Sequence, residues 1–143
     1  MHFANSVDID RPVGDVFAFV ADLENIPKWN YAIVETRKIS DGPVGVGTTY
    51  RQVRSVPTRS EETLRVTELE PARRFAVEGD LGPFAGTLAY DFEDLGGRTR
   101  LTNIADLEGR GLMKLAAAVA SGRVRDAVAA NLRALKQLLE RAS

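Results

Sequence analysis

Hydrophobic residues in the last quarter of the chain recur at intervals of three and four, the spacing of one helical face. The positions are Leu112, Leu115, Val119, Val124, Val128, Leu132, Leu135 and Leu139. No proline interrupts them, so the pattern predicts one amphipathic helix over Leu112–Arg141. At about 1.5 Å per residue this helix is roughly 45 Å long, which predicts that it lies along a curved sheet.

Ahead of this helix, apolar and polar residues alternate in short segments separated by glycine and proline turns. The alternation predicts strands at residues 2–9, 33–40, 46–55, 59–69, 73–79, 84–93 and 98–107. Seven strands joined by short turns indicate an antiparallel sheet with one buried face and one solvated face.

Two short helices are expected between the first two strands. Pro12 suits a first helical position, and this helix should end near Asp22. A second helical turn, Leu23–Ile26, should stop at Pro27, because proline disfavours helix at the residue before it. The predicted fold class is α+β, with one domain over residues 1–143.

Small side chains in the first half of the long helix suggest a cavity beneath it. They are Ala116, Ala117, Ala118 and Ala120. Because these residues fill little of the space between helix and sheet, we expect a cavity there, and a cavity suggests a ligand.

Composition narrows the chemistry available to this chain. A net charge of −1 gives no electrostatic basis for binding nucleic acid or anionic membranes. The absence of cysteine and the single His2 exclude thiolate chemistry and make metal sites and a Ser-His-Asp triad unexpected. We expect no metal and no cofactor. No signal peptide or membrane span is evident, so a cytoplasmic monomer or homodimer is expected.

Several segments resemble the SRPBCC or START-like superfamily, whose fold is the helix-grip, and in particular its polyketide cyclase/dehydrase-type branch. These segments are residues 12–17, 22–29, 46–50, 66–71, 97–102 and 131–136. The resemblance implies a curved seven-stranded sheet around the C-terminal helix, with a hydrophobic, ring-containing small molecule between them.

The superfamily contains aromatic polyketide cyclases, lipid and sterol carriers, hormone receptors and co-chaperone domains, so the resemblance leaves three roles open. The protein is a cyclase-like enzyme that orients its substrate, a carrier or sensor without chemistry, or a protein-interaction module. A Tyr–Glu or Arg–Glu pair inside the cavity would favour the enzyme. No catalytic residue is assigned.

Seven residues are candidate ligand contacts. They are Trp29, Tyr31, Tyr50, Gln52, Arg54, Tyr90 and Asn103. Trp29 and Tyr31 follow the short helices, where the resemblance implies the rim of the cavity; packing of the helices onto the sheet edge is the alternative for Trp29.

The other five candidates lie on strands. Tyr50, Gln52 and Arg54 share one strand face, but the opposite face is no more apolar, so periodicity leaves their direction open. Tyr90 lies on an apolar face and should be buried. Asn103 needs a partner if buried, and either a neighbour or a ligand meets that need.

Two acidic residues on strands, Glu62 and Glu78, are further candidates for a functional role. Glu62 has the same parity as Leu64 and Val66, and a buried carboxyl there would suit a general base. Because Glu61 precedes it near a strand start, however, we expect Glu62 at a solvated edge. Glu78 is also expected to be exposed.

Overall fold

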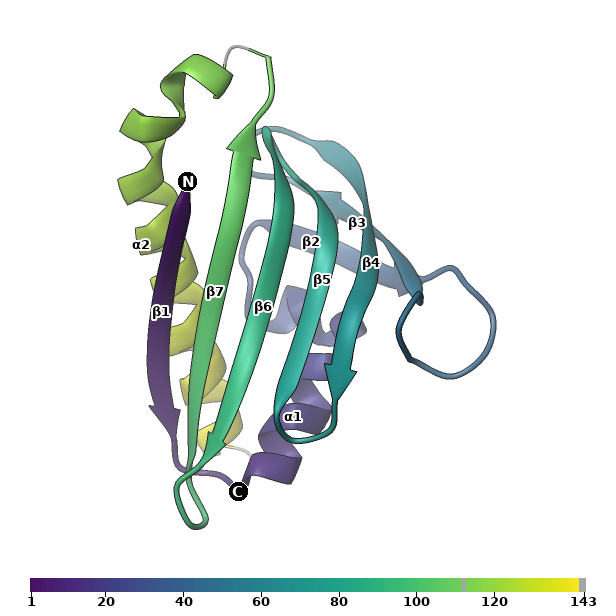
Figure 1. Ribbon diagram of the computed structural model, residues 1–143, viewed down its shortest axis with the longest axis vertical. Coiled ribbons are helices and arrows are strands. Elements are labelled where there is room, and N and C mark those ends of the chain that lie inside the picture. The colour runs from purple at the N-terminus through teal and green to yellow at the C-terminus, as the bar shows by residue number, and fades with distance from the viewer. Residues whose placement is uncertain (112, 142–143) are drawn as a thin grey trace.

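Seven antiparallel strands form one sheet in the order β1-β7-β6-β5-β4-β3-β2. The computed structural model describes residues 1–111 and 113–141, without the side chains of residues 113, 115 and 117–119. The elements in chain order are β1 (His2–Ile9), α1 (Val13–Ala21), the 3-10 helix η1 (Leu23–Lys28), β2 (Ile33–Lys38), β3 (Thr49–Arg54), β4 (Ser60–Glu70), β5 (Arg74–Leu81), β6 (Phe84–Asp94), β7 (Thr99–Gly109) and α2 (Met113–Arg141). Figure 1 shows this arrangement and confirms the predicted α+β helix-grip architecture.

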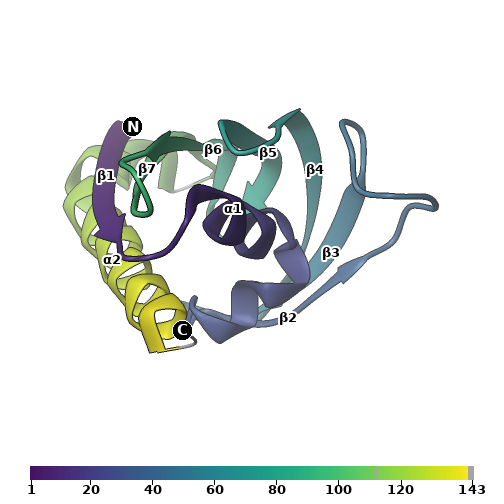
Figure 2. The same ribbon diagram turned by 90° about the horizontal axis from the view of Figure 1, so that it is seen from below.

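The sheet curves around an interior that the helices border. Seen from below in Figure 2, the strands bend from β1 round to β2, with α1 and η1 inside the bend and α2 along one side. Helix α2 packs against β1 and β7, and η1 packs against β2. The concave face is therefore the buried one.

Period-two alternation decides which residues each strand buries. Along β7, the buried side chains are Thr99, Leu101, Asn103, Ala105 and Leu107. The intervening residues are exposed or half-buried and lie on the convex face. This is the pattern of a sheet with one packed and one solvated surface.

Two glycines face each other on β5 and β6 where neighbouring backbones approach closely. Gly79 pairs with Gly86 across the two strands. A Cβ on Gly79 would overlap the carbonyl oxygen of Thr63, and one on Gly86 would overlap that of Asp106. Only a residue without a side chain allows four strands to approach this closely.

Apolar side chains form two clusters along the interior. The larger joins α1, η1 and the sheet to Leu132, Leu135 and Leu139 in the C-terminal half of α2. The smaller contains Phe3, Phe84, Ala105 and Leu107, against which Ala120, Val124 and Val128 of α2 pack. The two halves of α2 therefore contact different cores.

Polar contacts fix the C-terminal half of α2 to the first loop. Arg11 Nη1 donates to the Leu139 carbonyl at 2.9 Å, and Lys136 Nζ donates to the Asp8 carbonyl at 2.5 Å. The Asp10 amide donates to Glu140 Oε2 at 2.8 Å. These bonds join the end of the helix to the β1–α1 connection.

Two predicted boundaries are wrong for local reasons. Helix η1 continues through Pro27 to Lys28, because the amides of Trp29 and Asn30 both bond to the Ile26 carbonyl. Strand β3 begins at Thr49 instead of residue 46, because the Thr48 amide bonds to the Gly45 carbonyl at 3.1 Å and closes a turn there.

Part of the predicted helix lies outside the described residues. Leu112, where the helix was expected to begin, is one such residue. The side chains of Ala117 and Ala118, on which the expected cavity partly depends, are also outside the described set. No described helix has the length and apolar character needed to cross a membrane.

Candidate functional site

The polar face of β3 points into the concave interior. Tyr50 and Gln52 are 1% and 2% exposed, and the Arg54 side chain is 13% exposed. Tyr50 lies opposite the buried Leu64 of β4, which places it on the concave face. The pairing of β3 with β4 therefore shows that these side chains point inward, which the periodicity of the sequence left open.

Glu62 of β4 lies at the centre of a buried polar cluster. Its Oε1 accepts a hydrogen bond from Gln52 Nε2 at 2.8 Å. Its Oε2 accepts from Arg54 Nε at 2.8 Å, Ser60 Oγ at 3.1 Å and the Gly82 amide at 2.5 Å. The expectation of a solvated Glu62 is wrong, because Glu62 pairs with Gln52 and continues the buried row of Leu64.

The surroundings of Glu62 keep its carboxyl ionised. Burial raises the pKa of this group, but hydrogen bonds from Arg54, Gln52 and the Gly82 amide, with the charge of Arg54, outweigh burial and lower the pKa. Four donors already engage its two oxygens. A carboxylate stabilised in this way is a weak proton acceptor and acts as a structural anion.

Trp29, Tyr90 and Asn103 form a second group farther along the concave face. The Trp29 and Tyr90 rings meet edge to face, with centroids 6.4 Å apart and planes at 85°. Tyr90 lies opposite Asn103 in the β6–β7 pairing. Burial raises the pKa of Tyr90 to about 12 and outweighs the hydrogen bond with Asn103 that lowers it. The phenol is therefore neutral at physiological pH.

Five buried polar atoms have no hydrogen-bond partner within the described part of the chain. They are Trp29 Nε1, Thr36 Oγ1, Tyr50 OH, Gln52 Oε1 and Asn103 Oδ1. Buried polar groups in folded proteins are usually paired, and an unpaired one costs about 1–3 kcal/mol. Each of these five atoms therefore lacks, within the described residues, the partner that buried polar groups usually have.

Sequence reasoning missed Thr36 and, although it named Glu62, placed that side chain in solvent. Thr36 is 5% exposed and lies opposite Gln52 in the β2–β3 pairing. Its sequence neighbours are charged, so the burial follows only from the strand register. Glu62 had a usable signal, its parity with Leu64 and Val66, which the adjacent Glu61 masked.

The structure does not bring Tyr31 into this group. Its side chain is 65% exposed, whereas Trp29, two residues earlier, is 6% exposed. Trp29 packs in the larger apolar cluster, and Tyr31 extends into solvent.

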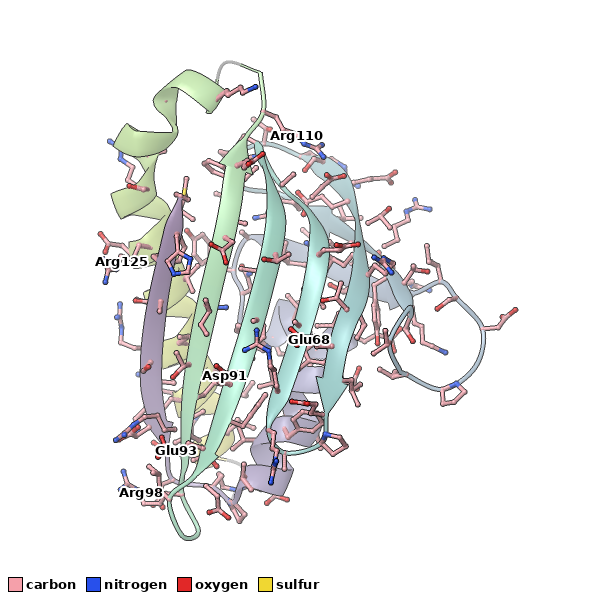
Figure 3. All side chains as sticks on the ribbon, in the orientation of Figure 1. Glu68, Asp91, Glu93, Arg98, Arg110 and Arg125 are labelled. Atoms are coloured by element: carbon pink, nitrogen blue, oxygen red, sulfur yellow. The ribbon has the colours of Figure 1, made fainter. Side chains whose placement is uncertain are left out.

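In contrast to the buried concave face, the convex face of the sheet carries ion pairs between exposed side chains. Arg74 of β5 donates to Glu68 at 3.0 Å and to Asp91 at 2.6 Å, and these two acidic residues, labelled in Figure 3, belong to the neighbouring strands β4 and β6. Glu78 pairs with Arg65 on the same face and is half-exposed. A surface hollow of about 190 Å³ lies between charged side chains of β2 and β3. The described residues contain no group of three or more His, Cys, Asp or Glu side chains placed to hold a metal ion.

Solved structures share this fold at low sequence identity. The Zhui aromatase/cyclase from Streptomyces sp. R1128 is 18% identical with a TM-score of 0.71, over 96% of this chain and 95% of that one. A START superfamily protein from Mycobacterium smegmatis is 16% identical with a TM-score of 0.78, over 96% and 98%. The di-domain aromatase/cyclase BexL, from the BE-7585A biosynthetic pathway, is 19% identical with a TM-score of 0.73, over 98% of this chain and 46% of its own length.

Family comparison covers nearly the whole sequence. No curated protein matches the chain. A family model described as polyketide cyclase / dehydrase and lipid transport matches residues 1–140. That match spans every described strand and nearly all of α2, so the chain belongs to the polyketide cyclase/dehydrase and lipid transport family.

Proposed function

We propose that this protein binds a hydrophobic, ring-containing small molecule between the concave face of the sheet and α2. The observation that carries the proposal is the set of five buried polar atoms without partners in the described residues, two of which, Trp29 Nε1 and Tyr50 OH, belong to side chains of the larger apolar cluster. Ligand sites are mostly apolar with a few polar groups that set orientation. A bound molecule would pair these atoms and remove the cost of leaving them unpaired.

The interior is suited to holding a molecule rather than to transferring protons. Glu62 is ionised and already engaged by four donors. Tyr90, with its pKa raised to about 12, stays protonated. Because neither group exchanges a proton readily near neutral pH, we propose binding or transport as the role.

One observation supports an enzymatic alternative. Arg54 and Glu62 form a buried ion pair with Nε and Oε2 2.8 Å apart. In a cyclase or dehydrase, the guanidinium would polarise a carbonyl of a substrate folded by the interior, and orientation would supply most of the rate. Recovery of a chemically changed ligand after incubation would select this role, and unchanged recovery would select the carrier.

A titration with the neutral fluorophore N-phenyl-1-naphthylamine tests the site. Leu88 lies between the two apolar clusters, and Thr87 is exposed on the same strand. We expect saturable one-to-one binding by the unmodified protein and binding at least about tenfold weaker for Leu88→Phe, which fills interior space. Thr87→Phe, the control, should bind as the unmodified protein does.

The outcome against the proposal is equally specific. If Leu88→Phe melts cooperatively and still binds the fluorophore as tightly as Thr87→Phe, the ligand does not lie in this interior. If the unmodified protein shows no saturable binding and organic extraction recovers no compound from it, the binding role itself is wrong.

A further inference from the structure

The interior contains balanced charge and two unpaired amide oxygens, Gln52 Oε1 and Asn103 Oδ1. We propose that it selects an uncharged ligand carrying a hydroxyl group and rejects the carboxylate built on the same ring skeleton. This inference rests on the proposed function and adds the polarity of the ligand to it.

Charge balance is the first argument. Glu62 is the charged residue in the buried set, and its partner Arg54 also projects from the concave face. Their 2.8 Å ion pair leaves no net positive charge there among the described residues. A carboxylate entering this region would add an uncompensated negative charge close to Glu62, which is costly in a buried site.

The orientation of Gln52 is the second argument. The Glu62 carboxylate accepts hydrogen bonds and donates none, so the Gln52 group that approaches it at 2.8 Å is the amide nitrogen. That contact fixes the amide, and Gln52 Oε1 is left as an unpaired acceptor. Rotating the amide would place two oxygens against each other.

Asn103 repeats this arrangement on β7. Asn103 lies opposite Tyr90 in the β6–β7 pairing and is 1% exposed. Its Oδ1 has no partner within the described part of the chain. Both buried amides therefore present an oxygen that needs a donor.

A hydroxyl group donates to the amide oxygens of Gln52 and Asn103, whereas an ionised carboxyl does not. An alcohol or phenol donates one hydrogen bond and accepts others, whereas an ionised carboxyl only accepts. Trp29 Nε1 and the hydroxyls of Tyr50 and Thr36 are unpaired groups that donate, so a ring oxygen or carbonyl elsewhere on the ligand is also accommodated. The chemical class that fits is a neutral, hydroxylated ring compound.

Three probes on one ring system test the inference at neutral pH. They are 2-naphthol, 2-naphthoate and 2-methylnaphthalene, titrated against the unmodified protein by following Trp29, the only tryptophan in the chain. We expect 2-naphthol to bind at least about tenfold more tightly than 2-naphthoate and more tightly than 2-methylnaphthalene.

Substitution of Asn103 tests whether its unpaired amide oxygen causes this preference for a hydroxyl group. Asn103→Leu removes one unpaired oxygen, so the preference for 2-naphthol over 2-methylnaphthalene should fall several-fold while binding of 2-methylnaphthalene persists. Gln137→Met, which removes an exposed amide on α2, is the matched control and should leave the preference unchanged.

The outcomes separate the two proposals. If 2-naphthoate binds as tightly as 2-naphthol, or if 2-methylnaphthalene does, the selectivity proposed here is wrong and the binding role stands. If none of the three probes binds, the proposed function fails with it.

Discussion

Four donors from three segments of the chain meet on the carboxylate of Glu62. Gln52 and Arg54 come from β3, Ser60 from the start of β4 and the Gly82 amide from the β5–β6 turn. A buried carboxylate with this many donors stabilises the fold only while all of them remain. The cluster therefore ties three segments of the sheet together at one point.

Removing the charge of Glu62 should destabilise the protein at neutral pH. We expect Glu62→Gln to lower the free energy of unfolding by about 2–4 kcal/mol, because Arg54 loses its partner in a buried setting. Urea unfolding at pH 7 measures the change. Glu61→Gln, one residue earlier and exposed, is the control and should change stability by less than about 0.5 kcal/mol.

The loss of stability in Glu62→Gln should become smaller as the pH falls. Because the folded-state pKa of Glu62 is lowered from 4.5, its stabilising contribution is present above the unfolded pKa and lost as pH falls through the folded pKa. The stability difference between the unmodified protein and Glu62→Gln should therefore shrink below about pH 4. A difference that stayed constant down to pH 2 would contradict the ionised state.

Tyr50→Phe should change the free energy of unfolding in the opposite direction to Glu62→Gln. The Tyr50 hydroxyl is buried without a partner, so Tyr50→Phe removes an unpaired polar atom and keeps the ring. We expect the ligand-free protein to gain about 1 kcal/mol, measured by urea unfolding. The exposed Tyr31→Phe serves as the comparison, and a loss of stability in Tyr50→Phe alone would show that the hydroxyl is paired.

At the residue scale, sequence reasoning named several of the buried polar side chains as candidates but left the direction of those on β3 open. Gln52 and Asn103 were identified by type and spacing. Glu62 was placed in solvent because adjacent acidic residues usually are solvated. Its burial depends on donors that are distant in sequence, with Gly82 twenty positions away, and no local pattern contains that information.

At the element scale, the close approach of β4, β5, β6 and β7 depends on two glycines. We expect Gly79→Ala and Gly86→Ala each to destabilise the fold by more than about 2 kcal/mol, because the added methyl group overlaps a backbone carbonyl oxygen. Thermal unfolding of the two variants measures this.

Gly122 provides a contrast within α2. A Cβ added there meets no described atom within 4 Å. Gly122→Ala should therefore stabilise the protein by about 0.5–1 kcal/mol through helix propensity. If all three alanine variants shifted stability equally, steric overlap at the strand glycines would not be their distinguishing property.

Element order was predictable because each strand carries a period-two pattern between turn residues. The ends of the strands and helices were less predictable, since they depend on hydrogen bonds in the connecting turns and between segments. The Thr48 amide bonds to the Gly45 carbonyl, and this turn moves the start of β3 to Thr49. Register also decided which face of β3 is buried, because neither face is distinctly apolar.

At the scale of the whole molecule, the two halves of α2 are held differently. Leu132 and Leu135 are 2% and 0% exposed, and Arg11 and Lys136 bind this half to the first loop. In the preceding half, Ala120, Val124 and Val128 are only partly buried. The C-terminal half is the better anchored of the two.

Hydrogen exchange should reveal this difference. We expect amides of residues 131–139 to exchange about tenfold or more slowly than those of residues 120–128, because local opening needs less packing to be broken in the latter. Addition of 2-naphthol should slow exchange in residues 120–128. Equal protection of both segments without ligand would contradict the unequal anchoring.

The pairing of β1 with β7 also determines the order in which the sheet can be assembled. His2 lies opposite Asp106, so the first strand finds its partner more than a hundred residues later. Strands β2 to β7 each neighbour the next in sequence and can pair as they emerge from a ribosome. Closing the longest loop costs entropy before any contact compensates, and such non-local pairings slow folding. Of the seven strands, the one synthesised first is thus the last that the sheet can accept.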